Sequence, residues 1–249
     1  MIDFYAAQSS ARSTIPGVPA LDSRRVVDGE RSIQFLKPLP ATSASRSFAI
    51  KSRVLGVYDK GKPGTVVETE QILYDTASGQ EYTRAVGSAF FVGQGNWNGP
   101  KGPKTVNYPP PENGVAPDHE YVHATNAESA HLYRLNGDYN PLHATPEPGA
   151  KMGFGGAIMH GLYSWNTTCH ALLKLLGNSD PRNIKEFAAR FASPVKPGDS
   201  LVTKIWRLGT GDDEGFEDVR FVTSVKGGKV VLSNGRAKIR CAGSRQSKL

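Results

Sequence analysis

The chain has 249 residues, of which 38% are hydrophobic and 21% are charged, and its formal net charge is +7. This length and balance fit one large domain or two modules of common size, and they exclude a wholly disordered chain. No apolar stretch is long enough to cross a membrane. Residues 1–4 lack the basic and apolar pattern of a secretory signal.

The positive charge is scattered along the chain, without a finger, RRM-like or basic-helix signature. We therefore expect no nucleic-acid partner, and we interpret the charge as suited to a phosphate-bearing small molecule or simply to solubility. The two cysteines, Cys169 and Cys241, have no metal-ligand spacing, so the sequence predicts free thiols and no metal site.

Three early segments are rich in β-branched and aromatic residues and are predicted to be strands, over residues 47–58, 64–74 and 81–92. Residues 75–79, Asp-Thr-Ala-Ser-Gly, are typical of a hairpin turn. Residues 94–120 are then rich in Gly, Pro and Asn, which interrupt regular structure, so we place a linker there.

Two helices are predicted after this linker. Residues 125–128, Thr-Asn-Ala-Glu, form a capping box that predicts a helix start, and Asn136-Gly137 predicts its end. Between Leu162 and Leu176 apolar residues recur at spacings of three and four, and Gly177 follows, which predicts an apolar core helix.

Strand patterns return in the last third of the chain, over residues 201–208, 216–225 and 229–241, with a tight turn at 226–228. The segments that begin at Phe35 and Phe191 each precede a long strand and a hairpin, so we predict a duplicated unit. A helix laid on a curved antiparallel sheet, repeated once, is an α+β arrangement.

The most informative segment is the run Gly-Asp-Tyr-Asn-Pro-Leu-His at residues 137–143, followed by Ile-Met-His-Gly-Leu at residues 158–162. This pattern resembles the R-specific enoyl-CoA hydratases of the hydratase 2 type, a MaoC-like family with a hot-dog fold. The resemblance extends through residues 190–199 and is closest to the two-module peroxisomal form.

The resemblance implies a double hot-dog in which curved antiparallel sheets are each wrapped on a helix, with the helix of the first module reduced or missing. We expect a variable lead at 1–28, a first module at 29–93, the linker at 94–120, a catalytic module at 121–242 and a tail at 243–249.

The resemblance also implies the site residues, with Asp138 and His143 as the acid/base pair. Hydration needs a group that activates water and a proton for the α-carbon, and a turn stiffened by Pro141 can fold both side chains toward one water. Which of the two gives the proton stays open. By resemblance, the amide of Gly161 forms an oxyanion hole and Asn140 orients the water or the substrate.

Three further positions lie close in sequence to these predicted site residues. We assign His160 a structural role at the start of the second helix. Thr145 stands where the family usually has Asp before proline, and we expect it to cap a short helix. Gly156 stands where a proline is common.

The resulting expectation is a hydro-lyase that interconverts trans-2-enoyl-CoA and (3R)-3-hydroxyacyl-CoA, in β-oxidation or a specialised metabolite pathway. It needs no cofactor, because coenzyme A is part of the substrate. We expect a homodimer, with import into the peroxisome through the receptor that binds Ser247, Lys248 and Leu249. The alternatives are a hot-dog acyl-CoA thioesterase and a non-catalytic acyl-CoA binding partner.

Overall fold

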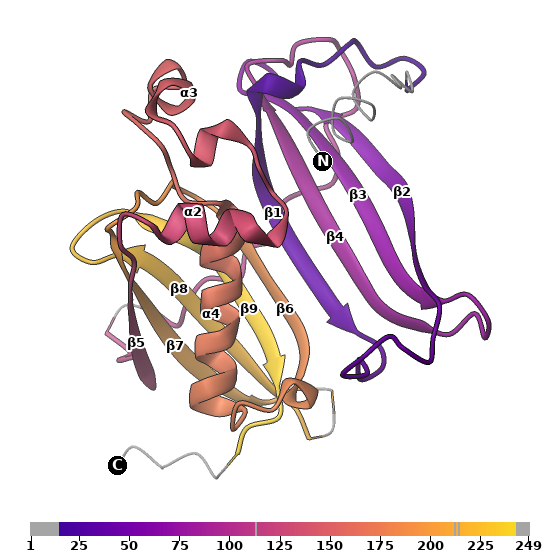
Figure 1. The fold of residues 1–249 in the computed structure, drawn as a ribbon, viewed down its shortest axis with the longest axis vertical. Coiled ribbons are helices and arrows are strands. Elements are labelled where there is room, and N and C mark those ends of the chain that lie inside the picture. Colours follow the sequence, from indigo (N-terminus) through magenta and orange to yellow (C-terminus); the bar gives the residue numbers. More distant parts are fainter. Residues whose placement is uncertain (1–14, 113, 212, 214, 243–249) are drawn as a thin grey trace.

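The computed structural model describes residues 15–112, 114–211, 213 and 215–242, and the predicted import signal at Ser247, Lys248 and Leu249 lies outside them. Nine strands of this part of the chain form one antiparallel sheet, in the order β2-β3-β4-β1-β6-β9-β8-β7-β5 (Figure 1). The strands are β1 (Val26–Phe35), β2 (Phe48–Asp59), β3 (Gly64–Asp75), β4 (Glu81–Val92), β5 (His119–Ala124), β6 (Ile184–Phe191), β7 (Ser200–Thr210), β8 (Glu217–Val225) and β9 (Val230–Ile239). The predicted curved antiparallel sheet is therefore confirmed, as a single continuous sheet.

The two halves of this sheet have the same internal order. In the first half β1 is followed by the meander β2, β3 and β4, and the last of these returns to pair with β1. In the second half β6 is followed by β7, β8 and β9, and β9 returns to pair with β6. Strands β1 and β6 pair with each other at the centre. The predicted repeat is present in the topology, with Phe35 ending β1 and Phe191 ending β6.

One long helix, α4 (Gly161–Leu176), lies across the inner face of the second half (Figure 1). Its predicted apolar stripe is buried, since Ala171 and Leu172 are 0% exposed and Leu176 is 2% exposed. Among the described residues before β5, the only helical element is the short 3-10 turn η1 (Ser23–Arg25). This agrees with the prediction that the first half has a reduced or missing helix, and it leaves the inner face of that half without a helix of its own.

The remaining helical elements are short and connect the strands around α4. They are α2 (Ser129–Tyr133), η2 (Arg134–Asn136), η3 (Pro141–His143), α3 (Pro146–Lys151) and η4 (Pro181–Asn183). In the described ranges, no helix combines the length and the apolar character that a membrane span requires.

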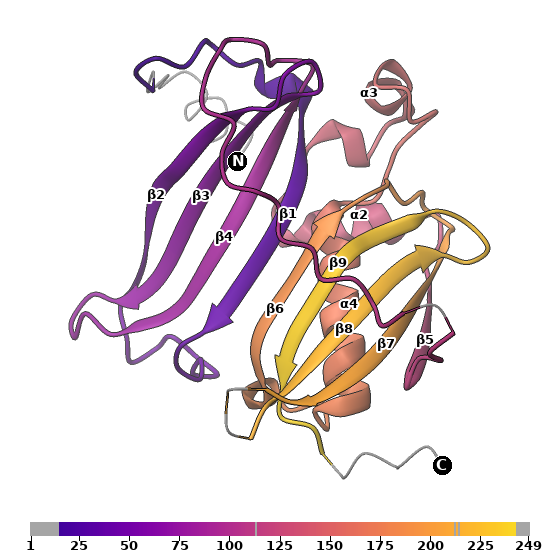
Figure 2. The same cartoon turned by 180° about the vertical axis from the view of Figure 1, so that it is seen from behind.

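The described residues of 93–112 and 114–118, most of the predicted linker, contain no helix or strand and cross the back of the sheet (Figure 2). The ring of Tyr108 stacks beneath two guanidinium groups, at 5.0 Å from Arg220 and 4.3 Å from Arg236. The indole Nε1 of Trp206 donates a hydrogen bond of 3.0 Å to the carbonyl of Val115. The segment is therefore held against the second half, while the division into modules at this point stays a prediction.

The sequence analysis did not predict three of the strands, β1, β5 and β6. The strand β1 runs across the predicted boundary between residues 28 and 29, and the division into a lead and a first module stays a prediction. Every residue of β1 is half-buried, because the strand is central in the sheet and both its faces are partly covered. Its polar residues are paired across the sheet, as with Glu30 and Arg190 at 3.2 Å. Because polar residues occur on both faces, the sequence of β1 lacks the alternation of apolar and polar residues that predicts a strand.

Two predicted helix caps differ from the structure. Thr125 does not begin a helix; its hydroxyl donates to the carbonyl of Asp199 at 2.8 Å and accepts from the amide of Gly198 at 2.9 Å. The helix begins later, at Ser129, and it ends before Gly137 as predicted. Thr145 is the N-cap residue of α3, but its side chain makes no capping hydrogen bond.

Candidate active site

The turn at residues 137–143 is built by local hydrogen bonds. Gly137 ends η2 with a φ of 111°, which is the left-handed region that favours glycine. The carboxylate of Asp138 accepts from the amide of Asn140 at 3.1 Å, and the Asn140 side chain accepts from the amide of Leu142 at 3.0 Å. Asn140 therefore caps η3, with Pro141 as the first residue of that element. Its predicted role toward water or substrate stays a prediction.

His143, the last residue of η3, is 8% exposed and is held in one tautomer. Its Nδ1 lies 2.9 Å from the carbonyl oxygen of Ile158. A carbonyl only accepts hydrogen bonds, so Nδ1 carries the proton and the neutral ring keeps a lone pair on Nε2. Burial lowers the pKa of this imidazole below its ordinary value, which favours the neutral form. The structure thus presents His143 as a base.

His160 belongs to the same cluster, although the sequence suggested only a structural role. Its ring stacks on that of His143, with centroids 3.8 Å apart and an interplanar angle of 25°. Its Nε2 donates to the carbonyl of Asp138 at 3.2 Å, while its buried Nδ1 has no partner among the described residues. Burial, and then the neighbouring His143, lower the pKa of His160. No sequence signal distinguishes this position, because the contact depends on how the turn folds back on α4.

Asp138 is the third member of the cluster and the one that solvent reaches. The structure brings one nitrogen or oxygen from each of Asp138, His143 and His160 within 4.8 Å of one another. Two acceptors at that separation can both hold one water at about 2.8 Å. The side chain of Asp138 is 52% exposed, so solvent reaches it. The predicted pair is thus brought together at a spacing that suits one water.

The same three residues could in principle hold a metal ion, because two imidazoles and a carboxylate are common ligands. Two observations weigh against this. The lone pairs of two stacked rings lie in nearly parallel planes, here 25° apart with centroids 3.8 Å from each other, whereas ligands of one ion must converge on it. In addition, His143 Nδ1 and His160 Nε2 are already engaged by backbone carbonyls.

Gly161 stands at the first position of α4, where backbone N–H groups lack intrahelical acceptors and the helix dipole is positive. The N-cap residue, His160, provides no side-chain cap. A Cβ at Gly161 would lie 3.2 Å from Asp28 Oδ2 and 3.2 Å from the ring of Phe191. The amide therefore stands at a helix start, in a space that suits a residue without a side chain, and its role as an anion-stabilising donor stays a prediction.

Asp28 and Arg31 are site residues that the sequence analysis missed. Both come from β1, and Arg31 Nε and Nη2 donate to Asp28 Oδ1 at 3.2 Å and 2.9 Å. The register of β1 against β4 shifts between Asp28 and Glu30, and at Gly29 a Cβ would come within 2.7 Å of Ser88 Oγ. No local signal could reveal that Asp28 faces Gly161, since the two residues are far apart in the chain.

A cavity of about 430 Å³ extends from Asp28 between the two halves. Its walls are the inner faces of β1, β3 and β4 on one side, and the first turns of α4 on the other. The lining residues on α4 are Leu162, Trp165 and Asn166. The uncovered inner face of the first half thus becomes a cavity wall beside the start of α4.

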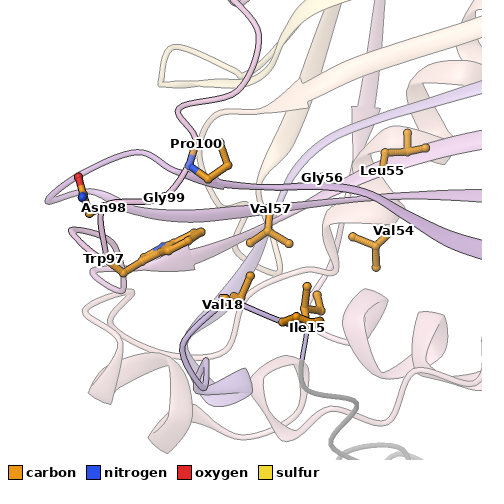
Figure 3. Close-up of a pocket in the computed structure, with 12 residues that line it drawn as sticks. Ile15, Val18, Val54, Leu55, Gly56, Val57, Trp97, Asn98, Gly99 and Pro100 are labelled. Atoms are coloured by element: carbon orange, nitrogen blue, oxygen red, sulfur yellow. The ribbon is translucent and has the colours of Figure 1, made fainter.

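A second hollow, of about 480 Å³, lies beside the edge strand β2 (Figure 3). Val54, Val57 and Trp97 point into it, together with Ile15 and Val18 (Figure 3). Its lining includes no acidic, basic, histidine or cysteine side chain. It therefore lacks the groups that acid/base chemistry requires, and the cavity next to Asp28 is the candidate substrate site.

Comparison with known proteins gives a family match for one segment of the chain. Residues 110–231 match the family described as MaoC like domain, and this segment contains the turn, η3 and α4. Residues 110–231 form a MaoC-like domain. The sequence similarity to individual proteins extends beyond residues 110–231.

The chain is 49% identical to the probable dehydratase NIT22 of Ajellomyces capsulatus, over 97% of this chain and 66% of that protein. It is 31% identical to the peroxisomal enoyl-CoA hydratase 2 of Arabidopsis thaliana, over 76% of this chain and 62% of that protein. The chain thus spans less than two thirds of the length of these relatives. A crystal structure of a MaoC-like dehydratase from Phytophthora capsici superposes with a TM-score of 0.77 at 29% identity, covering 92% of this chain and 77% of that one.

The two stacked histidines make stability depend on pH. Their folded pKa values lie below the ordinary 6.5, so between those values the unfolded chain binds more protons than the folded one. We expect the free energy of unfolding to fall as the pH drops through about 6.5. Urea unfolding from about pH 7.5 down to about pH 5 checks this. A His143→Gln/His160→Gln variant should show a flatter profile, and a profile as steep as that of the wild type would contradict the assignment.

Proposed function

We propose that this protein catalyses the reversible addition of water to a trans-2-enoyl-CoA, giving a (3R)-3-hydroxyacyl-CoA. The observation that carries the proposal is the cluster of Asp138, His143 and His160, in which one side-chain nitrogen or oxygen of each residue lies within 4.8 Å of the others, beside the uncapped start of α4. The names of the relatives, a probable dehydratase and an enoyl-CoA hydratase 2, support the same reaction class.

In this reaction the water oxygen bonds to C3 while the C2–C3 electron pair moves toward the thioester oxygen. Asp138 and His143 are both acceptors near neutral pH, so together they can hold the water and remove one of its protons. That proton then bonds to C2 as the thioester carbonyl re-forms. The addition is balanced by the single water, and the reverse sequence expels water from the 3-hydroxyacyl thioester.

The negative charge that develops on the thioester oxygen needs a donor fixed in advance. In our proposal the amide of Gly161 supplies it, helped by the positive end of the α4 dipole. The acyl group then extends into the cavity that begins at Asp28, because Asp28 lies against Gly161. No metal or nucleotide cofactor takes part in this scheme.

Removing either member of the acid/base pair should abolish hydration. We expect Asp138→Asn and His143→Gln each to lower kcat by about a hundredfold to ten-thousandfold, with thermal unfolding unchanged within a few degrees. The assay follows loss of the conjugated enoyl thioester and, in parallel, release of free CoA thiol. An Asp138→Asn protein as active as the wild type would sink the proposal. Thiol release without hydration would favour a thioesterase, and tight binding without turnover a non-catalytic partner. We expect the hydratase activity to persist when a metal chelator is added.

The role of the Gly161 amide can be isolated with a matched pair of variants. Gly161→Ala keeps the amide N–H and adds a Cβ, whereas Gly161→Pro adds a Cβ and deletes the N–H. Proline is tolerated at the first helical position, and the preceding His160 has φ −59° and ψ 138°, which is compatible with a following proline. We expect kcat of Gly161→Pro to fall about a hundredfold or more below that of Gly161→Ala. Equal rates for the two variants would exclude the amide as the donor.

We further propose that the enzyme works in the peroxisome as a homodimer. The name of the Arabidopsis relative supports the compartment, and the Ser247-Lys248-Leu249 tripeptide supplies the chemistry that the import receptor binds. A fluorescent protein fused in front of the full chain should collect in peroxisomes and should lose this location when the tripeptide is deleted. Sedimentation that finds only a monomer would remove the dimer.

A further inference from the structure

The cavity between the halves runs along the strands, so the strand register shows which side chains would contact an acyl group at each distance from Gly161. Nearest to Gly161, Asp28 pairs with Ala89, and Ala89 pairs with Val67 on its other side. Farther along, Ala85 pairs with Gln71. Gln71 lies four residues beyond Val67, which is about 13 Å of extended strand. Close to Gly161 the wall thus combines the apolar Ala89 and Val67 with the ion pair of Asp28 and Arg31, and farther along it carries the uncharged polar side chains of Thr69 and Gln71.

The distant part of the wall carries polar groups without partners. Thr69 pairs with Gly87 and Gln71 pairs with Ala85, so no long side chain on β4 covers either one. Both line the cavity, and neither side chain is hydrogen-bonded to another described residue. Thr69 is half-buried and Gln71 is exposed, so solvent reaches both side chains, and a purely aliphatic chain lying over them would exclude water without replacing its hydrogen bonds, at a cost in affinity.

The opposite wall, from α4, repeats this pattern. Leu162 lies in the first turn, next to the catalytic end, and Asn166 lies one turn farther on. The Asn166 amide nitrogen donates to the hydroxyl of Tyr133 at 2.8 Å, which leaves its carbonyl oxygen as an acceptor. The wall formed by α4 thus also offers a polar group, from the exposed Asn166, beyond the first turn of the helix.

We propose that this cavity selects acyl groups that carry a hydroxyl or keto oxygen several carbons away from the thioester. The inference rests on the proposed function and deepens it, because it names the class of substrate. Thr69 and Gln71 can each donate to such an oxygen or accept from it. A volume of about 430 Å³ is in the range of small-molecule pockets and suits an acyl chain of medium length.

The test compares thioesters that differ by one oxygen. Dissociation constants of decanoyl-CoA and ω-hydroxydecanoyl-CoA are measured by calorimetry, and KM and kcat are measured for the two matching trans-2-enoyl-CoAs. We expect the hydroxylated member to bind about threefold to tenfold more tightly, as one or two net hydrogen bonds allow. The difference should be present in KM and small in kcat, because the oxygen lies far from the reacting carbons.

Two variants connect the preference to these side chains. Thr69→Val/Gln71→Leu keeps the side-chain volumes similar and removes the polar atoms, so the preference should disappear or reverse. Gln34→Leu is the matched control: it removes the same amide from β1, but Gln34 follows Ile33 and so points to the other face of the sheet. The control should keep the preference of the wild type.

The outcomes separate this inference from the proposed function. Hydration of crotonyl-CoA, which is too short to reach Thr69, tests the function alone. Equal affinity for the two long thioesters, or tighter binding of the plain one, overturns the inference even if crotonyl-CoA is hydrated. If no enoyl-CoA is hydrated, the proposed function fails, and the two dissociation constants still decide whether the cavity selects oxygen.

Discussion

The pairing of β1 with β6 is the constraint on which the site depends. It joins two halves of the chain in one sheet, with Ile33 opposite Phe187 and Glu30 opposite Arg190. Glu30 also contacts Arg236 at 3.0 Å. Partly exposed ion pairs of this kind contribute about 0–1 kcal/mol each, so the backbone ladder and the buried Phe187 hold the seam together. Without this seam Asp28 would not face Gly161, and the cavity would lose one wall.

The two halves of the sheet contribute different parts of the candidate site because only the second half has a long helix on its inner face. In the second half α4 fills the inner face, and its first residue supplies the amide at the site. In the first half the inner face of β4 carries the small residues Ala85, Gly87 and Ala89, and the space above them stays open as part of the cavity. A helix there would occupy the space that a substrate needs. In the proposed function the first half therefore provides space for the substrate, and the second half provides the reactive groups.

Local signals in the sequence were sufficient for some parts of this structure. The spacing of Leu162 to Leu176 predicted α4, and the glycine and proline of the 137–143 turn predicted a bend that brings Asp138 and His143 together. These features depend on residues that are close in the chain. β1 was missed because its stability comes from two neighbouring strands and from charged partners such as Arg190, which leave no periodic pattern. Asp28 was missed, and His160 was assigned only a structural role, because each comes into the cluster through contacts across the fold.

The stacking of His143 on His160 limits how many protons the site can hold. Both rings are buried, both have lowered pKa values, and each would carry a charge 3.8 Å from the other if both were protonated. Like charges at that distance repel strongly in a poorly solvated site. The Asp138 carboxylate attracts a proton to this cluster, but a second proton on the stacked pair is opposed by the first. In the proposed reaction this arrangement favours an unprotonated Nε2 on His143 while water is bound, and it allows the pair of rings to accept a single proton when the water oxygen bonds to carbon.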